Sequence, residues 1–219
     1  SVGLVVTEVA TGWAAAADEY IDRGMGLRDQ YKGDPLINTH FAPHAPYSVS
    51  DATLARVRRL ADELDLPVAL HLHETAWEIA QSEQKFGLRP LARLKVLGLA
   101  SPQLVAVHMT QVIAEDLDTL ADAGASVVHC PESNLKLGAG VCPLPALLGR
   151  GIRVALGTDG AASNNDLDVL GEARTAGLVA SGMTGAPGSL IASDLLRMAT
   201  LEGARILGLG EVTGSLAPG

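Results

Sequence analysis

The chain has few of the residues that disulfide frameworks, thiolate metal sites and nucleic-acid surfaces require. Cys130 and Cys142 are the only cysteines, and they are too few and too far apart for a disulfide framework, a redox pair or a zinc knuckle. Aromatic residues make up 3% of the 219 positions, which removes the stacking surfaces of single-strand nucleic-acid binders. Basic residues number 16 against 25 acidic ones, and the net charge of −9 disfavours nucleic acid and anionic membranes as partners.

Long apolar runs and a basic leader are also missing from the sequence. Without an uninterrupted apolar stretch of about 18 residues, no membrane span is visible, and without a basic leader no signal peptide is visible. These absences predict a cytoplasmic protein. With 47% hydrophobic and 19% charged residues the chain is expected to fold, and no linker or low-complexity stretch divides it. A single domain over residues 1–219 is therefore predicted.

Short aliphatic runs alternate with longer segments of helical periodicity. This alternation is typical of βα units around a parallel sheet, so the fold class is α/β. The six expected strands are 4–6, 36–41, 68–73, 104–108, 126–129 and 153–156. The expected helices include a segment capped by Ser50 and ending near 64, then 76–86, 89–97, 113–123, 144–149, 167–181 and 193–207.

Residues that bind metals or move protons stand at or just after the ends of the last five strands. They are His44, His71, His108, His129 and Asp159. Their spacing resembles that of a (β/α)₈ barrel, in which one unit averages about 31 residues. The carboxyl ends of parallel strands meet on one face, where barrel enzymes place their active sites. A single strand-end histidine is usually structural, but five such residues in register indicate a site.

Imidazoles and a carboxylate, without a thiolate cluster, suit zinc, iron or manganese with an open coordination position. The chemistry that they predict is metal-assisted hydrolysis, in which Glu74 can pass a proton to a leaving group or ring nitrogen. The zincin motif is excluded, because Trp77 stands where its second histidine must be. The cytidine-deaminase motif, dinucleotide fingerprints and P-loops are also absent from the sequence.

Five motifs in order identify a family resemblance: F-A-P-H-A-P-Y at 41–47, H-L-H-E-T at 71–75, V-H at 107–108, H-C-P-E-S-N-L-K-L-G at 129–138 and G-T-D-G-A-A-S-N-N at 157–165. Together they resemble the amidohydrolase superfamily. The most similar branch contains the 5-methylthioadenosine/S-adenosylhomocysteine deaminases and the triazine chlorohydrolases. The resemblance implies a (β/α)₈ TIM-barrel fold and a hydrolase that uses one divalent metal, with zinc favoured over iron or manganese.

The resemblance also implies roles for individual residues. His71 and Asp159 match metal ligands, and Asp159 also matches the base for the metal-bound water. Glu74 matches the glutamate that contacts the purine edge and moves a proton to the ring nitrogen. His108 matches the histidine that steadies the hydroxide, and His44 matches the one that contacts the ribose. The pocket-lining positions are Ser163 and Asn134.

The family's first barrel strand carries an H-x-H pair of metal ligands that this sequence does not match, since no histidine precedes His40. His71-x-His73 has the same spelling but matches the fifth strand, and His73 is expected to share the face of His71 in a supporting role. The match covers about strands three to eight, without the accessory β-sandwich. A partial barrel with two open edges predicts a homo-oligomer or a complementing chain.

Three functions are therefore considered. The leading hypothesis is that the parent protein deaminates an adenine nucleoside: S-adenosylhomocysteine, 5-methylthioadenosine or adenosine. The second is an enzyme that dechlorinates or deaminates an s-triazine or another nitrogen heterocycle. The third, from a different class, is an inactive barrel fragment or an interaction subunit. It is motivated by the missing H-x-H ligands.

Overall fold

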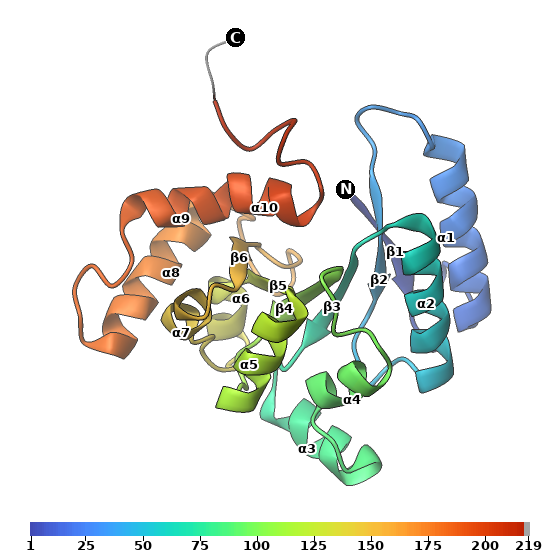
Figure 1. Cartoon of the computed structure of the whole chain (residues 1–219), viewed down its shortest axis with the longest axis horizontal. Helices are drawn as coiled ribbons and strands as arrows, with labels where there is room; N and C mark the ends of the chain where they lie inside the picture. The colour runs from blue at the N-terminus through green and yellow to red at the C-terminus, as the bar shows by residue number, and fades with distance from the viewer. Residues whose placement is uncertain (217–219) are drawn as a thin grey trace.

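Six parallel strands form one sheet whose spatial order is the order of the sequence (Figure 1). The computed structural model describes residues 1–216, and residues 217–219 of the expected domain lie outside this description. The strands are β1 (Val2–Val6), β2 (Thr39–Pro43), β3 (Val68–Leu72), β4 (Leu104–His108), β5 (Ser126–His129) and β6 (Arg153–Leu156). This arrangement confirms the α/β class and the partial barrel. The second strand begins later than expected, and Leu36 lies 89% exposed outside it.

Helices connect all of the strands. They are α1 (Ala17–Tyr31), α2 (Asp51–Leu64), α3 (Ala76–Phe86), α4 (Pro90–Val96), α5 (Ala114–Ala123), α6 (Pro131–Lys136), α7 (Leu144–Gly149), α8 (Val169–Thr184), α9 (Ala192–Ala199) and α10 (Leu201–Ile206). Helices α1 and α6 were not among the expected segments. The single helix expected over 193–207 is instead two helices, because Thr200 leaves helical geometry with φ −133° and ψ −87°.

Local capping explains why α2 and α3 begin where they do. The hydroxyl of Ser50 accepts the N–H of Thr53 at 3.3 Å, which confirms the predicted start of α2. Thr75 caps α3 in the same way by accepting the N–H of Glu78 at 3.2 Å. Helix α3 ends at Gly87, whose φ of 68° is the left-handed conformation that glycine adopts without strain.

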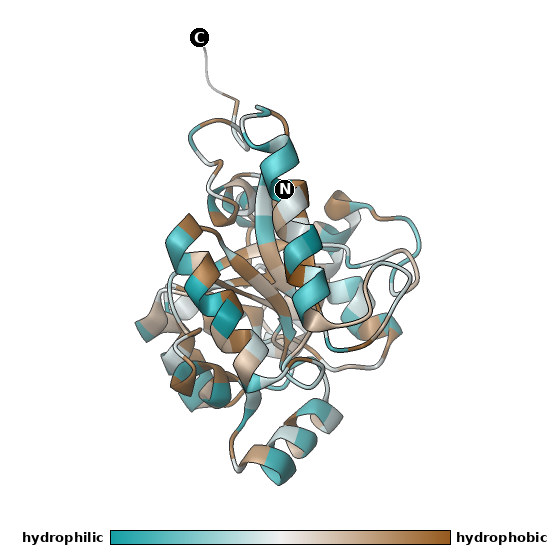
Figure 2. Cartoon of the chain, turned by 90° about the vertical axis from the view of Figure 1, so that its right-hand side faces the viewer, coloured by the Kyte–Doolittle hydropathy of each residue, from teal (hydrophilic) through white to brown (hydrophobic). Residues whose placement is uncertain are grey.

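The main core lies between the sheet and its helices, and alternation along each strand decides which side chains enter it. In β3, Val68, Leu70 and Leu72 are buried, whereas the intervening Ala69 and His71 are only partly buried. Figure 2 shows hydrophobic colouring concentrated in the sheet and hydrophilic colouring on outer helix faces. The side chain of His71 therefore lies on the opposite face of β3 from this core.

The two ends of the sheet differ in what packs against them. Helices α9 and α10 pack against β6 and α1 packs against β1, but Val2 and Val5 of β1 remain 44% and 48% exposed. Strand β1 therefore leaves apolar side chains in solvent at its edge. Among the helices within residues 1–216, none combines the length and apolar character needed to cross a membrane.

Candidate active site

Three histidines from successive strands lie side by side at the carboxyl ends of the sheet. His44 directly follows β2, His71 is the fourth residue of β3, and His108 ends β4. The ring centroids of His44 and His71 are 5.1 Å apart, and those of His71 and His108 are 5.3 Å apart. The Nε2 atom of His108 is 3.9 Å from Oε2 of Glu74. The sheet therefore gathers four of the residues singled out in the sequence into one cluster.

Asn134 holds the ring of His108 in its orientation through a contact with Nδ1, the ring nitrogen that does not face Glu74. The Nδ1 atom of His108 is 2.8 Å from the amide oxygen of Asn134, and both side chains are buried. An amide oxygen only accepts, so Nδ1 donates to it, and Nε2 faces Glu74. Asn134, expected to line the substrate pocket, thus also supports His108. Its role in binding substrate stays a prediction.

Asp159 follows β6 with φ +60°, a left-handed conformation that a side-chain-bearing residue rarely adopts. The hydroxyl of Ser133 donates to Oδ2 at 2.7 Å, and the N–H of Gly160 donates to Oδ1 at 2.7 Å. Burial opposes ionisation, but these hydrogen bonds and the nearby histidines lower the pKa of Asp159 below its usual value. Asp159 is therefore a carboxylate at neutral pH. Ser133 was missed in the sequence, although it precedes Asn134 in the same motif.

His71 is suited to act as a neutral ligand. Burial lowers its pKa, and the neighbouring His108 and His44 lower it further. His71 and Asp159 offer the nitrogen and oxygen donors that zinc accepts. However, no group of three or more His, Cys, Asp or Glu side chains within residues 1–216 is arranged to hold a metal ion. Because a catalytic zinc site needs three protein ligands, the described residues supply only part of one.

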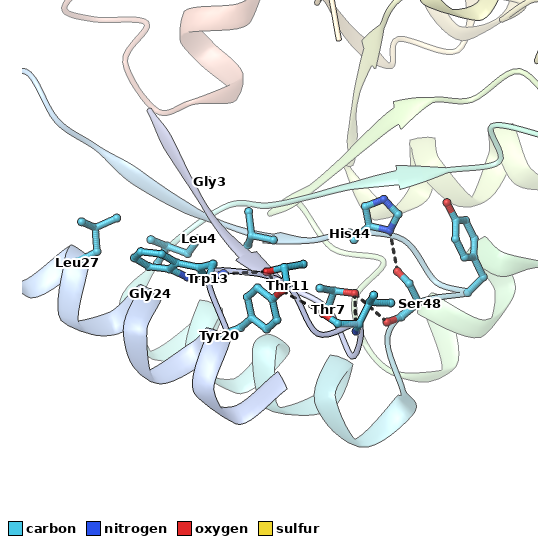
Figure 3. A pocket seen from close by; sticks show the side chains of 13 residues that line it. Gly3, Leu4, Thr7, Thr11, Trp13, Tyr20, Gly24, Leu27, His44 and Ser48 are labelled. Carbon is cyan, nitrogen blue, oxygen red and sulfur yellow. Dashed lines mark hydrogen bonds between the residues drawn. The ribbon is translucent and has the colours of Figure 1, made fainter. Parts of the chain in front are cut away.

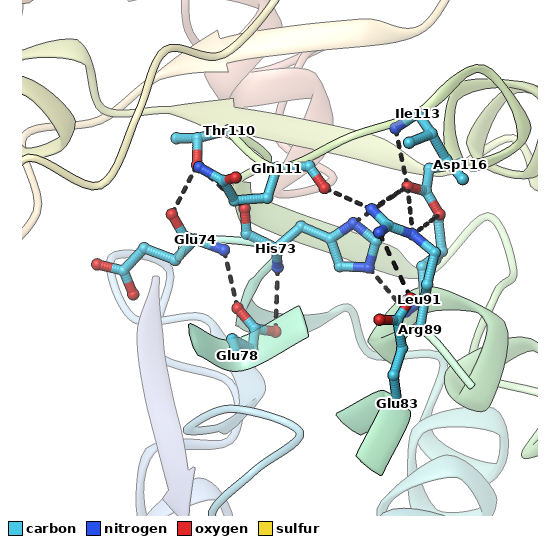
Figure 4. Close-up of polar contacts among 10 residues, drawn as sticks. All are labelled: His73, Glu74, Glu78, Glu83, Arg89, Leu91, Thr110, Gln111, Ile113 and Asp116. Atoms are coloured by element: carbon cyan, nitrogen blue, oxygen red, sulfur yellow. Dashed lines mark hydrogen bonds and ion pairs between the residues drawn. The ribbon is translucent and has the colours of Figure 1, made fainter. Parts of the chain in front are cut away.

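The backbone of Glu74 is held by a network that the sequence analysis did not identify (Figure 4). Glu78 is 1% exposed and accepts the N–H groups of His73 and Glu74 at 3.1 and 2.8 Å. Thr110 donates its hydroxyl to the carbonyl of Glu74 at 2.6 Å. The capping pattern Thr75-x-x-Glu78 was the signal that could have revealed Glu78. These contacts hold the chain at the point where the Glu74 side chain enters the cluster.

The expectation that His73 shares the face of His71 is wrong. His73 has φ +52°, so the chain turns after Leu72 and strand alternation no longer applies. Its buried ring points towards the helices: Nε2 accepts the N–H of Leu91 at 3.0 Å, and Nδ1 is 3.4 Å from Oδ2 of Asp116 (Figure 4). The supporting role expected for His73 agrees with this position.

The remaining candidates lie around the cluster. His129 is buried at the end of β5, and burial together with nearby His108 lowers its pKa to about 4. It is therefore neutral at physiological pH. Ser163 is partly buried in the loop after β6, where its N–H donates to the carbonyl of Gly160 at 3.0 Å. Its predicted contact with substrate stays a prediction.

A cavity of about 750 Å³ extends from the cluster along β1 and α1 (Figure 3). His44, Tyr47 and Ser48 line one end, and Nδ1 of His44 lies 2.8 Å from the hydroxyl of Ser48. Most of the remaining lining is apolar, including Leu4 and Trp13. The volume falls within the range of small-molecule binding sites, about 300–1,000 Å³. The cavity thus runs along the edge strand β1 and meets the cluster at His44.

Comparisons with known proteins agree with this arrangement. A model described as the amidohydrolase family matches residues 15–219. The 5-methylthioadenosine/S-adenosylhomocysteine deaminase of Teredinibacter turnerae is 51% identical over 214 residues, which cover 98% of this chain and 48% of the relative. The protein of the same name from Saccharophagus degradans is 44% identical over 218 residues, which cover 100% of this chain and 49% of the relative.

Two solved structures show the same likeness. An adenosine deaminase from Xanthomonas campestris with bound zinc aligns with a TM-score of 0.96 at 53% identity, covering 99% of this chain and 49% of that one. An atrazine chlorohydrolase from Arthrobacter aurescens, complexed with zinc and atraton, aligns with a TM-score of 0.88 at 26% identity, covering 98% and 50%. This chain spans about half the length of the relatives that it matches.

Proposed function

The chain belongs to the amidohydrolase family, and from this membership we propose that the protein is a metal-dependent deaminase of adenine nucleosides. The observation that carries the proposal is the cluster of His44, His71 and His108 beside Glu74 at the carboxyl ends of parallel strands. The relatives named 5-methylthioadenosine/S-adenosylhomocysteine deaminase are 36–51% identical, whereas the atrazine chlorohydrolase is 26% identical. This difference favours a nucleoside such as 5-methylthioadenosine, S-adenosylhomocysteine or adenosine over a triazine.

The reaction replaces the exocyclic amine of the purine by oxygen and releases ammonia. A bound divalent cation, most suitably zinc, supplies an activated water, and His71 and Asp159 are the residues of this chain that would hold the ion. Asp159 is ionised at neutral pH and can accept a proton from water. Glu74 can deliver a proton to the ring nitrogen and then to the leaving amine. His108 presents Nε2 to the same space because Asn134 holds its Nδ1–H.

The proposal includes a substrate class, a source for the missing metal ligands and a cellular location. The substrate is a small molecule, and His44, which lines one end of the cavity, is proposed to contact the ribose. Because His71 and Asp159 are only two donors, the proposal requires further metal ligands from outside the 219 residues: from the rest of the parent protein, from a second copy or from a complementing chain. The proposed location is the cytoplasm.

The experiment measures zinc retention and ammonia release by the purified parent protein after dialysis against zinc, and by the 219-residue chain treated in the same way. The substrates are adenosine, 5-methylthioadenosine and an amino-s-triazine. We expect zinc retention, together with ammonia release from the nucleosides. Asp159→Asn should abolish both. The control Asp118→Asn, at an exposed carboxylate paired with Arg150 at 2.8 Å, should change neither.

Other results would decide against the proposal. Ammonia release from the triazine alone would favour the heterocycle hydrolase. A parent protein that retains no zinc and releases no ammonia would overturn the proposal and favour an inactive barrel or an interaction subunit. An active parent beside an inactive 219-residue chain would support the proposal and place the remaining ligands outside this chain.

A further inference from the structure

Glu172 is a buried carboxyl group that none of the steps proposed for deamination uses. It lies in the first turn of α8 and is 0% exposed. Its Oε2 accepts the backbone N–H of Glu132 at 3.0 Å, and its Oε1 accepts the side-chain amide N–H of Asn164 at 2.5 Å. A carboxyl group is costly to bury unless hydrogen bonds satisfy it, so these two donors account for its place in the interior.

The two donors belong to two different segments of the chain. Glu132 is the second residue of α6, whereas Asn164 lies in the loop between β6 and α8. The side-chain oxygen of Asn164 accepts the N–H of Asn165 at 2.5 Å, and its backbone N–H donates to the carbonyl of Gly160 at 2.9 Å. Asn164 is thus fixed within its own loop, and Glu172 joins this loop to α6.

Both segments carry groups that hold the candidate active site. From α6, Ser133 donates its hydroxyl to Oδ2 of Asp159 at 2.7 Å. Asn134, the next residue, contacts Nδ1 of His108 at 2.8 Å. From the loop, Gly160 donates its N–H to Oδ1 of Asp159 at 2.7 Å. A shift of α6 relative to the loop would therefore separate Ser133 from Asp159 and turn the ring of His108.

We propose that Glu172 is a positioning residue, which holds α6 and the loop after β6 together so that Ser133 keeps the carboxylate of Asp159 in place. This inference rests on the proposed function, in which Asp159 holds the metal ion and accepts a proton from water. Replacing a residue that orients a metal ligand typically weakens metal affinity or activity by about 10–100-fold. Because Glu172 acts through Ser133, we expect the lower end of this range, about tenfold.

Glu172→Gln tests the proposal, because an amide accepts one of the two donors and turns its own NH₂ group towards the other. The double variant Glu172→Gln with Asn164→Asp reverses donor and acceptor between α8 and the loop, so it should restore the hydrogen bond. Glu172→Asp keeps the carboxyl group on a shorter side chain and replaces Glu172→Gln in the test if that variant does not fold. The control is Glu202→Gln, at a carboxylate that is 14% exposed and lies 3.5 Å from Arg153, at the amino end of β6 and therefore away from Asp159.

Hydrogen exchange, zinc affinity and the kinetics of ammonia release are measured for each variant of the parent protein. In Glu172→Gln we expect faster exchange over residues 131–136 and 159–166. Zinc affinity and kcat should each fall about tenfold, while KM changes less than about twofold, because the displaced groups act on the transition state. The double variant should return zinc affinity and kcat to within about threefold of wild type. Glu202→Gln should lower the free energy of unfolding without changing zinc affinity or kcat.

The outcomes separate the positioning role from the proposed function. If the folded Glu172 variant keeps the zinc affinity and kcat of an active parent protein, Glu172 only stabilises the fold and the inference is wrong. The inference is also wrong if the double variant restores neither quantity. If the wild-type parent protein neither binds zinc nor releases ammonia, the proposed function fails, and the positioning role fails with it.

Discussion

Asp116 is buried in the network behind Glu74, and we expect its replacement by asparagine to destabilise the fold in a pH-dependent way. It is 4% exposed and accepts hydrogen bonds from the guanidinium of Arg89 at 2.7 and 3.1 Å and from the N–H of Ile113 at 3.0 Å. Burial alone would raise the pKa of this carboxyl, but His73, Arg89 and Ile113 lower it to about 2 from 3.8.

The size of the effect follows from this shift. A pKa lowered by about 1.8 units stabilises the folded chain by about 2 kcal/mol at neutral pH. Because the folded pKa is depressed, this stabilisation is present above the unfolded pKa and is lost as pH falls through the folded one. Asp116→Asn should therefore lower the free energy of unfolding by about 2 kcal/mol at pH 7 and by about half as much at pH 3.

Urea denaturation at several pH values measures this prediction. The matched control is Asp118→Asn, on the same helix, where the carboxylate is 65% exposed and pairs with Arg150. An exposed pair contributes about 0–1 kcal/mol, so the control should change stability little. If the Asp116 variant loses no more stability than the control, or if its loss is the same at pH 7 and pH 3, the reasoning from the buried ion pair is refuted.

Two further predictions concern buried glutamates. Glu78→Ala leaves the N–H groups of His73 and Glu74 without their acceptor, which should lower the free energy of unfolding by about 2–4 kcal/mol and speed hydrogen exchange of both amide protons. Glu83→Ala, on the same helix, is the control. Equal effects of the two variants would contradict the assigned contacts. Burial is the main cause that raises the pKa of Glu172 to about 7 from 4.5. The folded chain therefore favours the protonated carboxyl, and the stability that this form contributes is present at low pH and lost as pH rises through 7. The wild-type free energy of unfolding should thus fall by up to about 3 kcal/mol between pH 4.5 and pH 7, and a Glu172→Gln variant with the same fall would disprove this assignment.

Most strands and helices could be predicted from the sequence because the patterns that indicate them lie within short segments. Aliphatic runs bounded by helical segments located five of the six strands closely, and Ser50 correctly marked the start of α2. The second strand was placed too early, since residue type alone did not reveal that Leu36 is exposed. Helix α1 was not predicted because its apolar residues form only a weakly amphipathic pattern. The division of the segment 193–207 into two helices was not predicted, because the non-helical backbone at Thr200 does not change the spacing of the apolar residues.

The gathering of His44, His71 and His108 was implicit in the sequence, because the carboxyl ends of parallel strands necessarily meet on one face. Which atoms face one another was decided only by the tertiary structure. The positive φ of His73 turns its ring away from the cluster, and Asn134 selects the protonated nitrogen of His108 from 26 residues away. These outcomes depend on backbone angles and on contacts between segments distant in the chain. The sequence by itself therefore determined which chemical groups are present and at which end of the sheet they stand, whereas packing between elements determined their orientation, protonation and support.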